Sequence, residues 1–163
     1  MTEKIFYVDG SCQINPGPGG YGVLNMVGSN IYYWYSERYQ NTTNNRMELS
    51  AVIHVLKLAK KDPTYKYIIY SDSAYVVNIC TSWIWKWARN NWTRDRGKSI
   101  ENIDLIKELY DLLTFSSFEY EIRKCPGHAG ILENEVVDAI ASHNQVKFNR
   151  LADKYNITYI DLK

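Results

Sequence analysis

The sequence predicts an α/β fold in which a five-stranded mixed sheet is flanked by helices. Three strand-like segments precede the first helical pattern, which indicates that the first three strands are antiparallel. Strand and helix patterns then alternate, and 45% hydrophobic with 23% charged residues is typical of a globular chain. At about 150 residues per domain, the 163 residues predict one domain over 1–163, with a core at about 4–146 and a C-terminal tail at 147–163.

The first part of the chain is rich in strand-forming residues. Strands are expected over residues 4–8, 21–27 and 31–39. Segment 15–20 is predicted to be a loop, because its prolines and glycines break regular helices. After the polar residues 41–45, which suit a helix N-cap, apolar residues recur at helical spacing up to Ala59. This helix is expected to end before Asp62.

The second part alternates helix and strand patterns. Strands are expected over residues 65–70 and 118–123, and helices over residues 74–88, 101–113 and 133–146. Residues 125–130 are expected to form a loop. Residues 157–160 near the end of the tail could add a marginal strand.

Composition and charge exclude several classes of protein. No stretch approaches the roughly 20 apolar residues that span a bilayer, and the acidic residues Glu3 and Asp9 argue against a signal peptide. Three widely spaced cysteines suit a reducing compartment, so we expect an unexported, cytoplasmic protein without membrane contact. The net charge of +1 gives no global sign of nucleic-acid binding, so such a function must be argued from local charge.

Two acids follow buried strands directly. Asp9 and Asp72 each stand where an apolar strand ends, and ligands of open α/β sheets collect at the carboxyl ends of strands. The competing interpretation is that Asp-Gly and Asp-Ser simply form turns. If the two strands are adjacent, carboxylates at ~4 Å repel by about 4 kcal/mol at an effective dielectric near 20. A cation would remove this cost, and oxygen ligands favour Mg²⁺ or Mn²⁺ over Zn²⁺.

Two other patterns concern possible ligands. Asp138 interrupts the apolar run 136–140, where an unpaired carboxylate would be costly. Cys125 and His128 have the spacing of a zinc ligand pair, but no second pair stands nearby in the sequence. A zinc site is therefore disfavoured.

Six motifs in order closely resemble type 1 ribonuclease H, and the match extends over about residues 4–146. The motifs are Asp9-Gly10-Ser11, Asn15-Pro-Gly-Pro-Gly-Gly-Tyr-Gly22, Thr42-Thr-Asn-Asn-Arg-Met-Glu-Leu49, Ser71-Asp72-Ser73, Pro126-Gly-His-Ala-Gly130, and Glu133-Asn134-Glu135 followed by Asp138. The resemblance implies a ribonuclease H-like fold. It also implies hydrolysis of the RNA strand in an RNA/DNA hybrid, without strong sequence preference, leaving 5′-phosphate and 3′-hydroxyl ends.

The resemblance also implies a catalytic centre. Asp9, Glu48, Asp72 and Asp138 match the family's four carboxylates, which bind two divalent ions, with Asp9 shared between them. The implied cofactor is Mg²⁺, with Mn²⁺ as a substitute. Two such ions lower the pKa of an attacking water and stabilise the leaving oxygen. His128 matches a histidine that assists proton transfer or product release.

Several positions are implied to hold the hybrid. Asn15, Asn44 and Asn45 match residues at the minor groove, where an amide can donate to and accept from a ribose 2′-hydroxyl. Helix capping is the alternative role for Asn44 and Asn45. Thr43 and Asn102 match a pocket for a DNA-strand phosphate, which positions the substrate without reading sequence. The residues next to Asp9, Gly10 and Ser11, are also expected to contact the substrate.

Residues 83–98 concentrate basic charge. This segment has a net charge of +4, from Lys86, Arg89, Arg94, Arg96 and Lys98 against Asp95. It matches the family's basic protrusion, which grips the DNA strand, and binding of this kind is salt-sensitive. We expect contacts from Trp83, Lys86 and Arg89. Four of the five tryptophans lie between 83 and 92, and at least two are expected to pack against helices.

Two other functions compete with this one. A relative of resolvases or integrases would keep the fold and cut DNA, but Asn44, Asn45 and the basic segment argue against it. A non-catalytic nucleic-acid-binding module would keep only the scaffold, but all four acids and His128 are present. No obligate protein partner is evident, and we expect a monomer.

Overall fold

A mixed β-sheet forms the centre of the structure, a computed structural model that describes residues 1–125 and 130–163. Within these residues the sheet has five strands in the order β3-β2-β1-β4-β5. The strands are β1 (Glu3–Cys12), β2 (Gly17–Val27), β3 (Asn30–Thr42), β4 (Lys66–Ser71) and β5 (Glu119–Lys124). The β1–β2 and β2–β3 pairs are antiparallel, whereas β4 runs parallel to both β1 and β5. The predicted fold class is confirmed.

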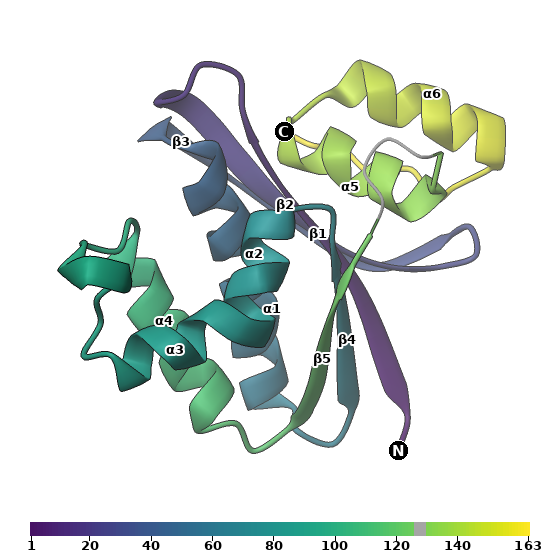
Figure 1. Ribbon diagram of the computed structural model, residues 1–163. Coiled ribbons are helices and arrows are strands. Elements are labelled where there is room, and N and C mark those ends of the chain that lie inside the picture. The colour runs from purple at the N-terminus through teal and green to yellow at the C-terminus, as the bar shows by residue number, and fades with distance from the viewer. Residues whose placement is uncertain (126–129) are drawn as a thin grey trace.

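Helices cover both faces of this sheet (Figure 1). One face carries α1 (Asn44–Lys61), α2 (Ala74–Asn78), α3 (Ile84–Arg89) and α4 (Ile103–Thr114), and the other carries α5 (Leu132–Ala141) and α6 (Gln145–Tyr155). A π-helical turn (Ile79–Trp83) joins α2 to α3, so the helical segment expected over 74–88 is present. A short 3₁₀ turn (Asp95–Gly97) follows α3. Among the described helices, none is long and apolar enough to cross a membrane.

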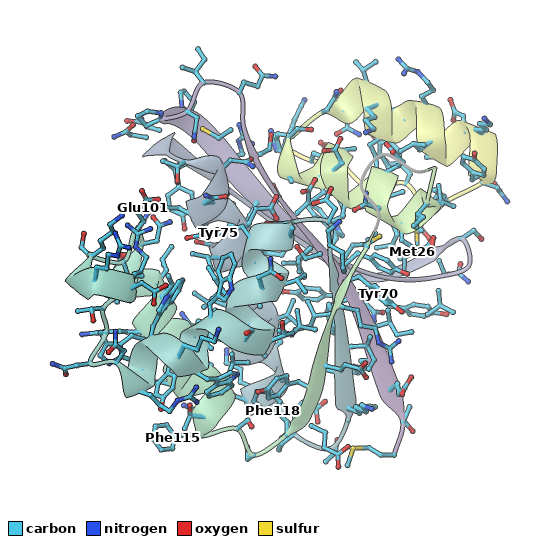
Figure 2. All side chains as sticks on the ribbon, viewed as in Figure 1. Met26, Tyr70, Tyr75, Glu101, Phe115 and Phe118 are labelled. Atoms are coloured by element: carbon cyan, nitrogen blue, oxygen red, sulfur yellow. The ribbon has the colours of Figure 1, made fainter. Side chains whose placement is uncertain are left out.

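Two hydrophobic cores lie on the two sides of the sheet. The larger one packs α1 and α4 against the sheet through residues such as Leu56 and Leu109, which are fully buried. The smaller one packs α5 and α6 against β2 through residues such as Ile140 and Phe148. Figure 2 places Met26 on the α5 side of the sheet. Helices therefore pack on both faces of the sheet, with one apolar core on each side.

The structure corrects the predicted loop over 15–20. Residues 17–20 belong to β2, because Gly19 and Gly20 pair with β1 on one side and with β3 on the other. A Cβ atom on Gly19 would lie 2.5 Å from the carbonyl oxygen of Ser11, so only glycine allows strands this close. A register shift between Gly17 and Gly19 accommodates Pro18, which has no N–H to donate.

The C-terminal part also differs from the expectation. The helix expected over 133–146 ends at Ala141, because His143 adopts a left-handed conformation with φ of 56°. A second helix, α6, follows in the tail, where the sequence indicated no helix. Residues 157–160 do not form the marginal strand, but Ile157 and Ile160 are buried in the smaller core. Burial of apolar residues, rather than local pattern, holds this tail in place.

Candidate active site

Asp9 and Asp72 are brought together by strand pairing. In the parallel β1–β4 pair Val8 lies opposite Ser71, so the acid that follows each of them lies at the same sheet edge. Asp9 is buried, with 4% of its surface exposed, and Asp72 is half-buried. The two strands are therefore adjacent, as the expected repulsion between their acids requires.

Glu48 reaches the same edge from α1. This helix begins after Thr43, whose hydroxyl accepts a hydrogen bond from the backbone N–H of Arg46 at 3.2 Å. The helix packs closely on β1, because a Cβ atom on Gly10 would lie 2.5 Å from the backbone nitrogen of Glu48. Glu48 is 3% exposed. Glycine after Asp9 thus sets the distance between the strand and the helix.

The three side chains form a compact carboxylate cluster. Asp9, Glu48 and Asp72 each offer one oxygen, and these oxygens all lie within 4.8 Å of one another. Burial raises the pKa of Asp9, and the charges of Glu48 and Asp72 raise it further. Burial also raises the pKa of Glu48, and Asp72 adds to this effect. Like charges at a buried site disfavour ionisation, so a cation bound among these oxygens would favour their charged forms.

This cluster fits a hard divalent cation. The buried Oε2 atom of Glu48 has no hydrogen-bond partner among the described residues. An unpartnered buried carboxylate oxygen is costly unless a cation or donor satisfies it. The three converging side chains supply oxygen ligands, which Mg²⁺ and Mn²⁺ prefer.

Asp138 lies beside this cluster, on α5. Its side chain is 31% exposed, and its proximity contributes to the raised pKa of Asp9. Its carboxylate is not unpaired, because Oδ2 lies 2.6 Å from Nζ of Lys147 on α6. Lys147 also contacts Glu135 at 2.8 Å. Sequence reasoning missed the role of Lys147, because no local pattern indicated that α6 exists, whereas Glu135 belongs to the motif at the start of α5.

His128 lies outside the described residues, together with the rest of segment 126–129. Its assignment stays a prediction from the motif.

The predicted minor-groove residues gather near the start of α1. The side-chain oxygen of Asn15 accepts a hydrogen bond from the backbone N–H of Asn44 at 2.8 Å, which joins the loop before β2 to the helix. Thr43 is the N-cap of α1, so neither Asn44 nor Asn45 has the capping role considered for it. Asn44 is exposed and Asn45 is half-buried. Ser11 lies at the end of β1, paired with Gly20.

Asn102 is held in a network between α2 and α4. It adopts a left-handed conformation with φ of 59° immediately before α4. Its amide donates to the Tyr75 hydroxyl at 3.1 Å and its carbonyl accepts from Arg46 at 3.4 Å. Arg46 also pairs with Asp104 through two contacts of 3.0 and 2.8 Å. Figure 2 shows Tyr75 and Glu101, the neighbour of Asn102, on the same side of the molecule. Sequence reasoning missed Arg46.

The basic segment 83–98 forms a groove of about 800 Å³. Among its lining residues are Trp83, Lys86, Trp87, Arg94, Arg96 and Lys98. Arg89 is exposed and does not line this groove. Trp85 and Trp92 pack on Tyr110 of α4, with ring centroids 5.7 and 5.1 Å apart. The expectation that at least two tryptophans pack against helices is confirmed.

Comparisons with known proteins show which family the chain resembles. The family model described as RNase H matches residues 1–146. A protein named Ribonuclease H from Caldicellulosiruptor saccharolyticus is 42% identical over 142 residues, which cover 86% of this chain and 94% of that protein. The crystal structure of LC9-RNase H1, described as a type 1 RNase H with the type 2 active-site motif, has 31% identity and a TM-score of 0.67, and covers 86% of this chain and 71% of that one.

A further solved structure shows the same fold at lower identity. The crystal structure of LC11-RNase H1 in complex with RNA/DNA hybrid is 20% identical, with a TM-score of 0.60. The match covers 87% of this chain and 98% of that one.

Proposed function

The chain belongs to the RNase H family, and we propose that it hydrolyses the RNA strand of RNA/DNA hybrids at the carboxylate cluster on the edge of β1 and β4. The observation that carries this proposal is the convergence of Asp9, Glu48 and Asp72 within 4.8 Å. The unpartnered oxygen of Glu48 supports the same conclusion, because it leaves a ligand atom directed at no protein donor among the described residues. The function is that of a ribonuclease H.

Four carboxylates have proposed roles as metal ligands. Asp9, Glu48, Asp72 and Asp138 would hold two Mg²⁺ ions, which Mn²⁺ could replace, with Asp9 shared between them. When bound, the ions lower the pKa of an attacking water and stabilise the leaving oxygen, which gives 5′-phosphate and 3′-hydroxyl ends. Burial of Asp9 and Glu48 excludes water from one side of the cluster. His128 has the proposed role of moving a proton or aiding product release.

Recognition of the hybrid is divided between its two strands in this proposal. Asn15, Asn44 and Asn45 would meet ribose hydroxyls in the minor groove, with Gly10 and Ser11 beside the cleaved strand. The hydrogen bond between Asn15 and Asn44 supports a shared surface for these groups. Backbone and sugar contacts of this kind carry no sequence preference.

The DNA strand would be held by two further elements. Thr43 and Asn102 would bind one phosphate, and Arg46 connects them, because its backbone N–H binds Thr43 and its guanidinium binds Asn102. The groove lined by Trp83 and Lys86 supplies the basic surface. Arg89 would contact the strand outside this groove.

A cleavage panel tests the proposed function. The purified protein is incubated with an end-labelled RNA/DNA hybrid, single-stranded RNA, double-stranded RNA and double-stranded DNA, in Mg²⁺, Mn²⁺ or chelator. We expect metal-dependent cutting of the hybrid's RNA strand alone. Asp9→Asn should abolish cutting while hybrid binding persists, because it removes the shared ligand and leaves the binding surface intact. Full activity of this variant would refute the site.

The same panel separates the competing functions. Cutting of double-stranded DNA would indicate the resolvase-like or integrase-like alternative. Metal-independent hybrid binding without turnover in either metal would indicate a non-catalytic binding module.

We also propose that the protein acts as a cytoplasmic monomer without an obligate protein partner. The three widely spaced cysteines support a reducing compartment. Light scattering on the purified chain tests the monomer, and a mass of about twice the 19.0 kDa of the chain would contradict it.

A further inference from the structure

Lys147 places a positive charge beside the carboxylate cluster. Its Nζ atom lies 2.6 Å from Oδ2 of Asp138 and 2.8 Å from Oε2 of Glu135. The three side chains are between 23% and 31% exposed, so the ion pairs are partly shielded from water. Asp138 in turn lies close enough to Asp9 to contribute to the raised pKa of that buried acid. The ammonium is thus one side chain away from the buried acids.

The backbone of Lys147 is fixed where α6 begins. Its N–H donates to the side-chain oxygen of Asn144 at 3.0 Å, which caps the helix. The next residue, Phe148, is fully buried in the smaller core. His143, in the turn before α6, binds the carbonyl oxygen of Leu162. The ammonium therefore extends from an anchored first turn rather than from a fraying helix end.

Lys147 and a divalent ion would compete for the carboxylate of Asp138, because both are positively charged. Asp9, Glu48 and Asp72 attract any cation, and Asp138 is the proposed ligand on the α5 side of the cluster. Lys147 already pairs with Oδ2 of Asp138, one of the two oxygens that this carboxylate could offer to an ion. Two positive charges on one carboxylate in a partly buried site repel each other.

We propose that Lys147 is a tethered cation that pairs with Asp138 in the metal-free enzyme and is displaced from it when a divalent ion binds. This inference rests on the proposed function, because it takes Asp138 as a metal ligand. Lys147 also pairs with Glu135. The ammonium can therefore leave Asp138 and still keep one ion pair. Lys147 is a positioning residue in this scheme, and it lowers the affinity of the site for divalent ions.

Binding of Mn²⁺ to the substrate-free protein tests the inference. Free Mn²⁺ is measured by electron paramagnetic resonance for the wild type, Lys147→Met and the control Lys154→Met. The control removes the same charge from the exposed far end of α6, about 10 Å away along the helix. We expect Lys147→Met to bind Mn²⁺ about three- to tenfold more tightly, and Lys154→Met to change affinity by less than about twofold.

The same measurement on the Asp138→Asn variant shows whether the effect of Lys147 on Mn²⁺ affinity depends on Asp138. In Asp138→Asn, adding Lys147→Met should leave Mn²⁺ affinity unchanged, because the carboxylate for which the two cations compete is gone. Circular dichroism confirms that each variant is folded. Three results would each overturn the proposal: unchanged or weaker binding by Lys147→Met, an equal gain in Lys154→Met, or a gain that persists in the Asp138→Asn background.

The outcome also distinguishes this inference from the proposed function. Failure of the wild type to bind Mn²⁺ at the cluster would remove the metal site itself, and with it both proposals. Mn²⁺ binding that is lost in Asp9→Asn but insensitive to Lys147 would keep the metal site and reject only the tethered cation.

Discussion

Gly10→Ala tests how closely α1 must approach β1 for the carboxylate cluster to form. The added Cβ atom would lie 2.5 Å from the backbone nitrogen of Glu48 and 2.8 Å from the carbonyl carbon of Met47. Both obstacles are backbone atoms of a helix, so no side-chain rotation relieves the clash. An ordinary contact of 3.4 Å requires the helix and strand to separate by about 0.9 Å at this point.

The expected cost follows from this displacement. Overpacking of a buried site typically costs about 1–3 kcal/mol, and we expect the free energy of unfolding to fall by about 2 kcal/mol. For a chain of this length that corresponds to a decrease in Tm of about 4–8 °C. Glu48 is at the point of contact, so its carboxylate moves away from Asp9. Mn²⁺ affinity and hybrid cleavage should therefore fall together with stability.

Urea unfolding and Mn²⁺ binding measure the two effects, and Gly28→Ala is the matched control. Gly28 lies in the turn between β2 and β3 with φ of 62°, and its Cβ would have no atom within 4 Å. We expect Gly28→Ala to lower the free energy of unfolding by about 1 kcal/mol through backbone strain and to keep full Mn²⁺ affinity. If Gly10→Ala keeps both its stability and its Mn²⁺ affinity, the close approach does not position Glu48.

Three further predictions concern residues around the site. His54 is hydrogen-bonded to the Tyr33 hydroxyl at 2.7 Å, and burial lowers its pKa. Its contribution to the free energy of unfolding should therefore be complete above about pH 6.5 and decline below it. Urea unfolding from about pH 5 to 8 should show a smaller decline in His54→Phe. Asn102→Gly keeps the left-handed backbone but loses the Tyr75 contact, so we expect weaker hybrid binding with little loss of stability, whereas Asn102→Ala should cost about 1 kcal/mol more in unfolding experiments. Lys86→Gln should reduce the slope of log affinity against log salt by about 1 in hybrid-binding titrations, and an unchanged slope would place Lys86 off the phosphate backbone.

The fold class and the order of the main elements could be predicted from sequence patterns alone. Apolar periodicity located α1 and α4, and strand-forming runs located β1 and β4. These signals are local, because each element buries its own apolar face. The acids at the ends of β1 and β4 were visible for the same reason, since a polar residue that ends a buried strand stands out in the pattern.

Three other features depend on packing between separate elements. Residues 17–20 form a strand because β1 and β3 pair with them on both sides, which outweighs the poor strand propensity of glycine. Helix α6 is present because Phe148 and Ala152 find a core formed by β2 and α5. The ion pair between Lys147 and Asp138 then follows from the packing of α6 on α5. In each case the stabilising partner belongs to another helix or strand, so the pattern within one segment could not reveal it.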